Sequence, residues 1–207
     1  KHPAAVRKSV PSAYSSLQIF RNSLFQHIAM RNQNHILRFH FRHFVDSVCV
    51  SPDDRRVVRP ALERAAQTGS PAFAIELPDG TVVTGKGAGI MNADASAVLN
   101  AIKHMAGISD EIYLLSPIIL EPIVDLKKNV LGIAEPVLSL DEVLLALSIC
   151  AATNTVAELA ISKLGDLRNC QAHASYMLSQ SNEIMLSKLG VQFTCEDTYP
   201  NNDLYYV

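Results

Sequence analysis

The sequence predicts an α/β fold: a layered domain with a mixed sheet, in which an N-terminal β-hairpin is followed by alternating helices and strands. The first observation is Asp79-Gly80, a strong hairpin signal because it lies between two β-rich runs. The second is the alternation of helical patterns with short strand-like runs after that hairpin. The third is a set of helix-capping signals, such as Ser139 with Glu142 three residues later. An antiparallel hairpin joined to such units predicts a mixed sheet.

The first element of this domain is a helix that we expect to begin near residue 51. Ser51 is a good N-cap, Pro52 suits the first helical position, and two acidic residues follow in the first turn. Pro60 is expected to kink or restart the helix, and Gly69 to close it near Thr68.

The hairpin and a long helix come next. We predict strands over Ala72–Leu77 and Thr81–Thr84, and a helix over about residues 93–106. Asn92 or Asp94 is the expected cap of that helix.

The middle of the domain is expected to contain a buried strand and a helix. Glu111–Ser116 is a compact apolar run, which predicts the strand. A turn follows at Ser116-Pro117, and Pro122 restarts a helix that continues to about Val130.

Two capped helices follow. The capping box at Ser139 opens a helix to about Thr153 that is apolar nearly all round, which predicts burial on most sides. A second box, Thr155-Val156-Ala157-Glu158, opens a helix that stops at Gly165.

The last elements are two strands with a helix between them. Ala172–Leu178 and Val191–Cys195 read as the strands. Ser179 or Ser181 caps the helix, which ends at Gly190.

Composition narrows the class of protein. The 207 residues suffice for one good-sized core, or for a core with an appendage. With 48% apolar and 18% charged residues, the chain is typical of soluble globular proteins. No apolar run reaches the roughly 20 residues that a membrane-spanning helix needs, so we expect no membrane contact.

Cysteine usage indicates the compartment. The four cysteines lie far apart without a Cys-x-x-Cys pair, which argues against a zinc ribbon or a thioredoxin-type site. No secretory signal is present, so reduced and mostly buried thiols are favoured over disulfides. We therefore expect a cytoplasmic protein. The chain also starts without Met, so we expect a fragment or a processed product.

The N-terminal segment differs in charge from the rest. Residues 1–45 hold seven Lys or Arg and no Asp or Glu, so the remainder of a chain with net charge −2 carries −9. We therefore divide the chain into a basic, atypical segment, 1–48, and an α/β domain, 49–207. The segment is an appendage or a piece that is not native to the domain. The alternatives are a transit peptide and a nucleic-acid contact, although nucleic acid is not the expected partner.

A glycine-lysine pattern precedes the long helix. Gly80-x-x-x-x-Gly85-Lys86 is nearly a nucleotide-binding P-loop, but Gly87 follows where a Ser or Thr would hold magnesium. The four intervening residues are also a predicted strand rather than a loop. A weaker anion site stays open, in which Gly85, Lys86 and Gly87 contact a phosphate before a helix N-terminus. The alternative is a connection with a solvated lysine, since Asp94 would repel a phosphate.

Four further residues are candidates for a site. His173 is either a strand-end histidine bonded to the backbone or a group that transfers protons or binds a ligand. Ser116 and Glu121 follow a predicted strand, where α/β sheets tend to bind ligands. Asn154 is either a helix cap or a ligand contact. We assign His173 and Glu121 as candidate catalytic residues and expect no metal, because no acids have a suitable spacing.

Five ordered motifs indicate a family. They are PAFAIELPDGTVVTGK, AVLNAIKHMAGISDEIYLLSP, LDEVLLALSICAATN, NCQAHASYMLS and KLGVQFTCE. In this order they resemble the C-terminal part of a bacterial family, the domain of unknown function 1846, from about Ser51 to Tyr205. The resemblance implies cytosolic proteins more than twice this length, whose N-terminal half carries its own glycine-rich segment. This chain departs from the family pattern at Gly87, often Thr or Ser, and at Gln171, where an acid is usual.

Two functions follow as hypotheses. The first is a structural or ligand-binding module that packs against the missing N-terminal half. The alternative is an enzyme domain that contributes residues to a shared site for a phosphate-bearing or nucleotide substrate. The expected partners are that half and a small phosphate-bearing ligand, with homo-oligomers as a further possibility. The sequence identifies no cofactor.

Overall fold

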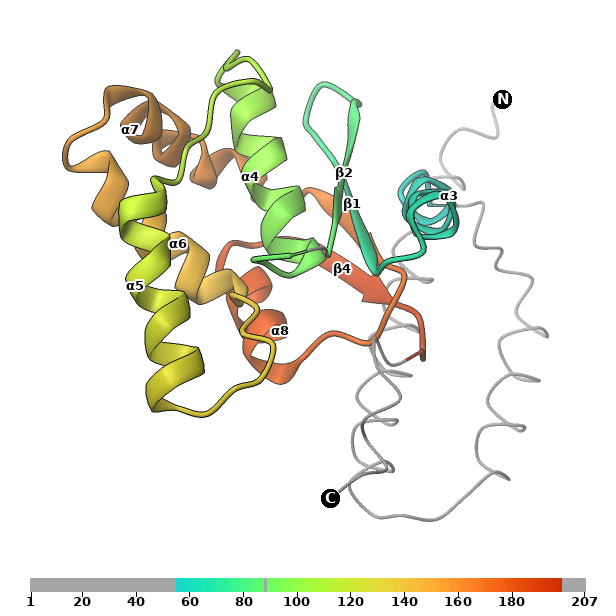
Figure 1. The fold of residues 1–207 in the computed structure, drawn as a ribbon. Coiled ribbons are helices and arrows are strands. Elements are labelled where there is room, and N and C mark those ends of the chain that lie inside the picture. Colours follow the sequence, from blue (N-terminus) through green and yellow to red (C-terminus); the bar gives the residue numbers. More distant parts are fainter. Residues whose placement is uncertain (1–54, 88, 199–207) are drawn as a thin grey trace, which may run out of the picture.

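The computed structural model describes residues 55–87 and 89–198, shown in colour in Figure 1. These residues form helices around one four-stranded sheet, which confirms the predicted α/β class. The basic segment 1–48 and the helix start expected at Ser51 lie outside the described residues.

The sheet is mixed, as predicted. Its strands are β1 (Ala72–Glu76), β2 (Val82–Lys86), β3 (Gln171–Ala174) and β4 (Gln192–Cys195), in the spatial order β2-β1-β3-β4. β1 is antiparallel to both β2 and β3, whereas β3 and β4 are parallel.

The hairpin between β1 and β2 has the predicted turn. The Leu77 N–H donates to the Thr81 carbonyl at 2.8 Å, and the Asp79 carboxylate accepts from the Thr81 N–H at 2.8 Å. Gly80 has φ 84°, a left-handed conformation that glycine adopts without strain. β2 nevertheless continues through Lys86, so Gly85 and Lys86 belong to a strand and not to the expected loop.

One face of the sheet packs on α3 (Val58–Thr68). Val57, Ala61 and Ala74 form a small buried cluster there. Pro60 lies in the first turn, where a missing N–H breaks no helical hydrogen bond, so no restart is needed. Gly69 ends the helix in the left-handed conformation, as predicted.

The opposite face carries the main core and most of the helices (Figure 1). α4 (Ala93–Met105) packs on β1 and β2, where the alternate residues Phe73 and Ile75 face it. The Asn100 amide donates to the Thr84 carbonyl at 2.9 Å and so joins α4 to the edge strand. The remaining helices around this core are α5 (Pro117–Asp125), α6 (Leu140–Ala151), α7 (Thr155–Ser162) and α8 (Gln180–Lys188).

Gly85 sets the distance between β2 and α4. A Cβ at this position would lie 2.2 Å from the Ala97 nitrogen and 2.6 Å from the Ala93 carbonyl oxygen. Both are backbone atoms, which cannot swing aside as a flexible side chain can. A residue without a side chain is therefore required for the helix to pack this close to the strand.

The strand predicted over Glu111–Ser116 is wrong. This stretch forms turns, beginning with a hydrogen bond from the Ile112 N–H to the Ser109 carbonyl at 3.1 Å. Leu114 and Leu115 are buried, but Tyr113 is 87% exposed. A short apolar run is compatible with a buried strand and also with a turn that buries two leucines. The pattern of apolar residues therefore does not distinguish the two structures.

Two helices differ from their predictions. α5 begins at Pro117, and Pro122 lies inside it rather than restarting it; a π-helical turn, Leu126–Val130, continues the helix. The capping box of α6 at Ser139 is confirmed. The expectation that α6 is buried on most sides is wrong, since Leu145 and Ile149 are 66% and 55% exposed.

The C-terminal part has the predicted order of strand, helix and strand, but both strands are shorter than predicted. β3 ends at Ala174 instead of Leu178, and Ser179 caps α8 by accepting from the Asn182 N–H. The thiols of Cys150, Cys170 and Cys195 are buried, as expected.

Candidate functional site

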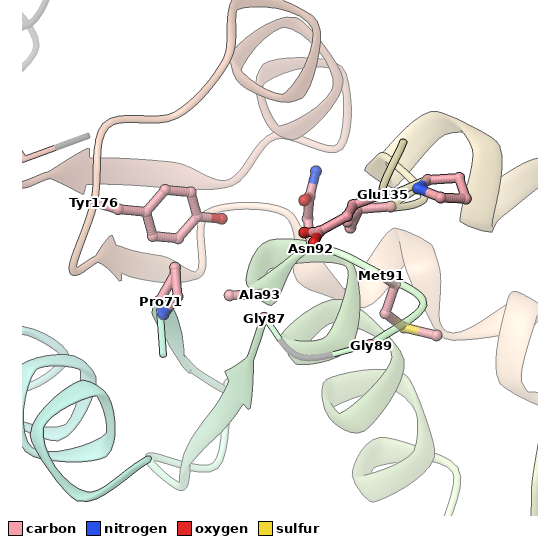
Figure 2. A pocket seen from close by; sticks show the side chains of 10 residues that line it. Pro71, Gly87, Gly89, Met91, Asn92, Ala93, Glu135 and Tyr176 are labelled. Carbon is pink, nitrogen blue, oxygen red and sulfur yellow. The ribbon is translucent and has the colours of Figure 1, made fainter. Parts of the chain in front are cut away.

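A cavity of about 480 Å³ lies at the N-terminal end of α4 (Figure 2). Four chain segments far apart in the sequence form its wall: the residue before β1, the β2–α4 connection with the start of α4, the segment preceding α6, and the turn after β3. The lining residues are Pro71, Gly87, Gly89, Met91, Asn92, Ala93, Glu135, Pro136, Val137 and Tyr176.

Backbone hydrogen bonds tie these segments together. The Gly87 N–H donates to the Pro71 carbonyl at 2.7 Å. The Asn92 N–H donates to the Leu138 carbonyl at 3.0 Å, and the Leu138 N–H to the Ile90 carbonyl at 2.7 Å. These hydrogen bonds hold the segments of the wall together, which favours a preformed site.

A buried acid lies directly behind the cavity wall. Asp94, in the first turn of α4, is fully buried, and its Oδ1 accepts the Tyr176 hydroxyl at 2.9 Å. Its other oxygen, Oδ2, has no hydrogen-bond partner among the described residues. Burial raises the pKa of Asp94 from 3.8 to about 6, and the Tyr176 hydroxyl and nearby backbone N–H groups offset only part of this effect. Burial, and then the Asp94 charge, raise the pKa of Tyr176 well above its usual value.

This hydrogen-bonded pair lies at the border of the cavity. Tyr176 borders the cavity, and Asp94 is connected to the cavity through the Tyr176 hydroxyl. An acid whose pKa is displaced by burial beside a cavity is a typical feature of functional sites. The sequence predicts Asp94 as a helix cap or as a charge that repels a phosphate, and it does not indicate Tyr176 or Glu135 as site residues. No local signal could have identified them, because the pair forms across 82 residues of sequence.

Only one residue of the predicted anion site borders the cavity. Gly87 is part of the wall, whereas Gly85 packs against α4 and Lys86 is an exposed strand end outside the wall. Asn92 takes the N-cap position of α4 without a side-chain hydrogen bond to the helix. The start of α4 therefore faces the cavity without a lysine beside it.

His173 belongs to a different, buried network. Its Nδ1 lies 2.7 Å from the Thr194 hydroxyl, and its Nε2 lies 3.2 Å from the Glu196 carboxylate. The Arg55 guanidinium also donates to the Thr194 hydroxyl. Both ring nitrogens face protein groups and the side chain is fully buried. This geometry favours the structural alternative for His173.

Ser116 and Glu121 are not part of the cavity at α4. Glu121 borders a second hollow of about 470 Å³ on α5, together with Ile90 and Asp125. The Ser116 N–H donates to the Cys150 sulfur at 3.4 Å at the start of α5. The structure therefore does not bring Glu121 and His173 into a common site.

Asn154 serves as the cap of α7. Its amide oxygen accepts from the Val156 N–H at 2.9 Å and the Ala157 N–H at 3.4 Å, which places the cap one residue before the predicted box. The structure therefore favours the capping alternative over a ligand contact.

We expect Asn154→Ala to lower the free energy of unfolding by about 1 kcal/mol, because it leaves two helix N–H groups without an acceptor. Denaturant unfolding of both proteins measures this difference. Asn154→Asp retains an acceptor and is expected to stay close to the wild type. Equal losses in the two variants would contradict the capping role.

Two further observations concern the described part of the chain. Residues 55–87 and 89–198 contain no group of three or more His, Cys, Asp or Glu side chains placed to hold a metal ion. None of the helices in these ranges is long and apolar enough to cross a bilayer.

Comparison with known proteins identifies the family. A family model described as "Domain of unknown function DUF1846, C-terminal" matches residues 53–205. The chain is 46% identical over 170 residues to a UPF0371 protein of Clostridioides difficile (strain 630), covering 78% of this chain and 34% of that protein. It is 47% identical over 162 residues to a UPF0371 protein of Clostridium tetani, covering 74% and 32%. The chain thus spans about a third of the length of these relatives, and it belongs to the DUF1846 family, whose C-terminal domain it contains.

Proposed function

We propose that this chain is the ligand-binding module of a longer protein and that the cavity at the start of α4 holds a small polar ligand. The observation that supports this proposal is the buried Asp94 behind the wall, with one oxygen unpartnered among the described residues. A buried carboxyl group without full hydrogen bonding destabilises a fold. Proteins tolerate such groups mainly where function requires them.

The preformed wall also supports a binding role. The cavity volume of about 480 Å³ lies within the range of small-molecule sites, and both polar and apolar groups line the cavity. Because this chain covers only 34% of such a relative, we propose that the remaining chain of such proteins packs against this module and completes the cavity. We also propose a cytoplasmic location and self-association as further properties of the whole protein.

A second candidate is an enzyme domain for a phosphate-bearing or nucleotide substrate. The observation that favours it is that Gly87 and the N-terminus of α4 border the same cavity as Tyr176. A helix N-terminus attracts anions, and Asp94 with its pKa of about 6 would donate or accept a proton through Tyr176.

Filling the cavity tests the proposed function. Val137 borders the cavity and is 37% exposed, so Val137→Trp is expected to block the cavity without unfolding the chain. Thermal unfolding would be measured with neutral sugars, sugar phosphates and ATP as probes. We expect at least one probe to raise the Tm of the wild type and Val137→Trp to abolish that shift.

Leu62→Trp provides the matched control, because Leu62 is 40% exposed on α3 and lies outside the cavity wall. It should keep the full ligand-induced shift. The proposal fails when no probe shifts the wild type, or when Val137→Trp responds as the wild type does.

A further inference from the structure

We infer, given the proposed binding role of this cavity, that its ligand is a neutral, hydroxyl-rich molecule of the sugar or polyol class, held by Glu135 and Tyr176. This inference goes beyond ligand binding as such and disagrees with the phosphate expected from the sequence. It rests on the donor and acceptor groups in the cavity wall and on the charges around it.

The polar side chains of the wall offer mainly acceptors. They come from Asn92, Glu135 and Tyr176, and no Lys, Arg or His is among the lining residues. A carboxylate accepts hydrogen bonds but donates none, so Glu135 selects donors on the ligand. Asn92 can either donate or accept.

Tyr176 also acts as an acceptor toward the cavity. Its only proton is donated to Asp94 at 2.9 Å, which leaves the lone pairs of the phenol oxygen for the ligand. In Figure 2 the Tyr176 hydroxyl points toward the side of the cavity where Asn92 and Glu135 lie. Two acceptors, Glu135 and Tyr176, therefore border one space, and a ligand that bridges them needs at least two donor groups.

The charges around the cavity disfavour an anion. Lys86, the cation expected to bind a phosphate, is outside the wall, while the carboxyl groups of Glu135 and Asp94 lie in or behind it. Two acids oppose the partial positive charge of the α4 N-terminus, which amounts to about half a charge. A neutral ligand avoids this repulsion.

The apolar part of the wall fits the same class of ligand. Pro71, Met91 and Val137 complete the cavity around the acceptors. A sugar ring presents hydroxyl donors at its edge and C–H groups on its faces, which matches this combination. The volume of about 480 Å³ is adequate for a monosaccharide.

Two-dimensional NMR of the 207-residue chain tests the inference. The backbone amides of Gly87 and Gly89 report on the cavity, and D-glucose and myo-inositol are compared with inorganic phosphate and glucose 6-phosphate. We expect the neutral probes to move both amide signals in a saturable way. Glu135→Gln should raise their Kd about tenfold, because it removes a charge-assisted hydrogen bond. Glu111→Gln, exposed and outside the wall, should leave the Kd unchanged.

The possible outcomes separate the inference from the proposed function. When phosphate or glucose 6-phosphate moves the two signals and Glu135→Gln tightens that binding, the inference is overturned and the binding role stands. When neither neutral probe binds, or when Glu135→Gln leaves their Kd unchanged, the inference is overturned as well. The binding role itself fails on its own test, when no probe gives a thermal shift that depends on Val137.

Discussion

Gly85→Ala is expected to lower the free energy of unfolding by about 3 kcal/mol, the upper end of the usual cost of overpacking, because the added atom meets rigid backbone. The added Cβ would meet the Ala97 nitrogen at 2.2 Å and the Ala93 carbonyl at 2.6 Å. To relieve these contacts, α4 must move away from β2. That movement disturbs the largest helix–strand contact of the fold and the wall of the cavity at Ala93.

Urea unfolding at neutral pH measures this loss, with Gly165→Ala as the matched control. Gly165 has a negative φ, and a Cβ there meets nothing within 4 Å. Its substitution should change the free energy of unfolding by less than about 0.5 kcal/mol. Similar effects for both glycines would show that α4 does not pack against Gly85 as described.

Asp94→Asn is expected to stabilise the chain by about 3 kcal/mol at pH 8 and to have little effect below pH 4. The pKa of Asp94 is about 6 in the folded chain and 3.8 when unfolded, and each unit corresponds to about 1.4 kcal/mol. Between these values the folded state keeps a proton that the unfolded state has lost, so wild-type stability falls as the pH rises. The loss is complete by about pH 7, one unit above the folded-state pKa. Asn removes the charge but retains an acceptor for the Tyr176 hydroxyl.

Denaturant midpoints of wild type and Asp94→Asn from pH 3.5 to pH 8 test this prediction. The difference should develop between about pH 4 and pH 7 and then remain constant. Asp110→Asn, at an exposed position, should stay within about 0.5 kcal/mol of the wild type throughout. A variant that is less stable than the wild type at pH 8 would show that the Asp94 charge is satisfied in the fold.

Local sequence signals are sufficient to predict most of the helices and strands that the structure describes. Asp79-Gly80 predicted the hairpin and the Ser139 capping box predicted α6, because turn and cap chemistry act within four residues. Local signals gave a wrong prediction at Glu111–Ser116, because this apolar run has no neighbouring strand to pair with and forms turns instead. It also failed for α6, since the exposure of Leu145 depends on which helices pack nearby.

Most residues of the candidate site could not be predicted from local sequence patterns. Gly87 was found because glycines before a helix are a known anion-site pattern, yet Gly85 proved to be a packing residue. Asp94 and Tyr176 meet only through the fold, so neither sequence position reveals their hydrogen bond. His173 is a reactive residue type, but its partners Thr194 and Glu196 come from β4 and the residue after it, and they favour a structural role.

A crystal structure of the chain with the probe that gives the largest thermal shift shows where this probe binds. We expect electron density for the probe at the start of α4, between Gly87, Glu135 and Tyr176. Density for the bound probe at another place, such as the hollow beside Glu121 on α5, with the cavity at α4 empty, would contradict this expectation.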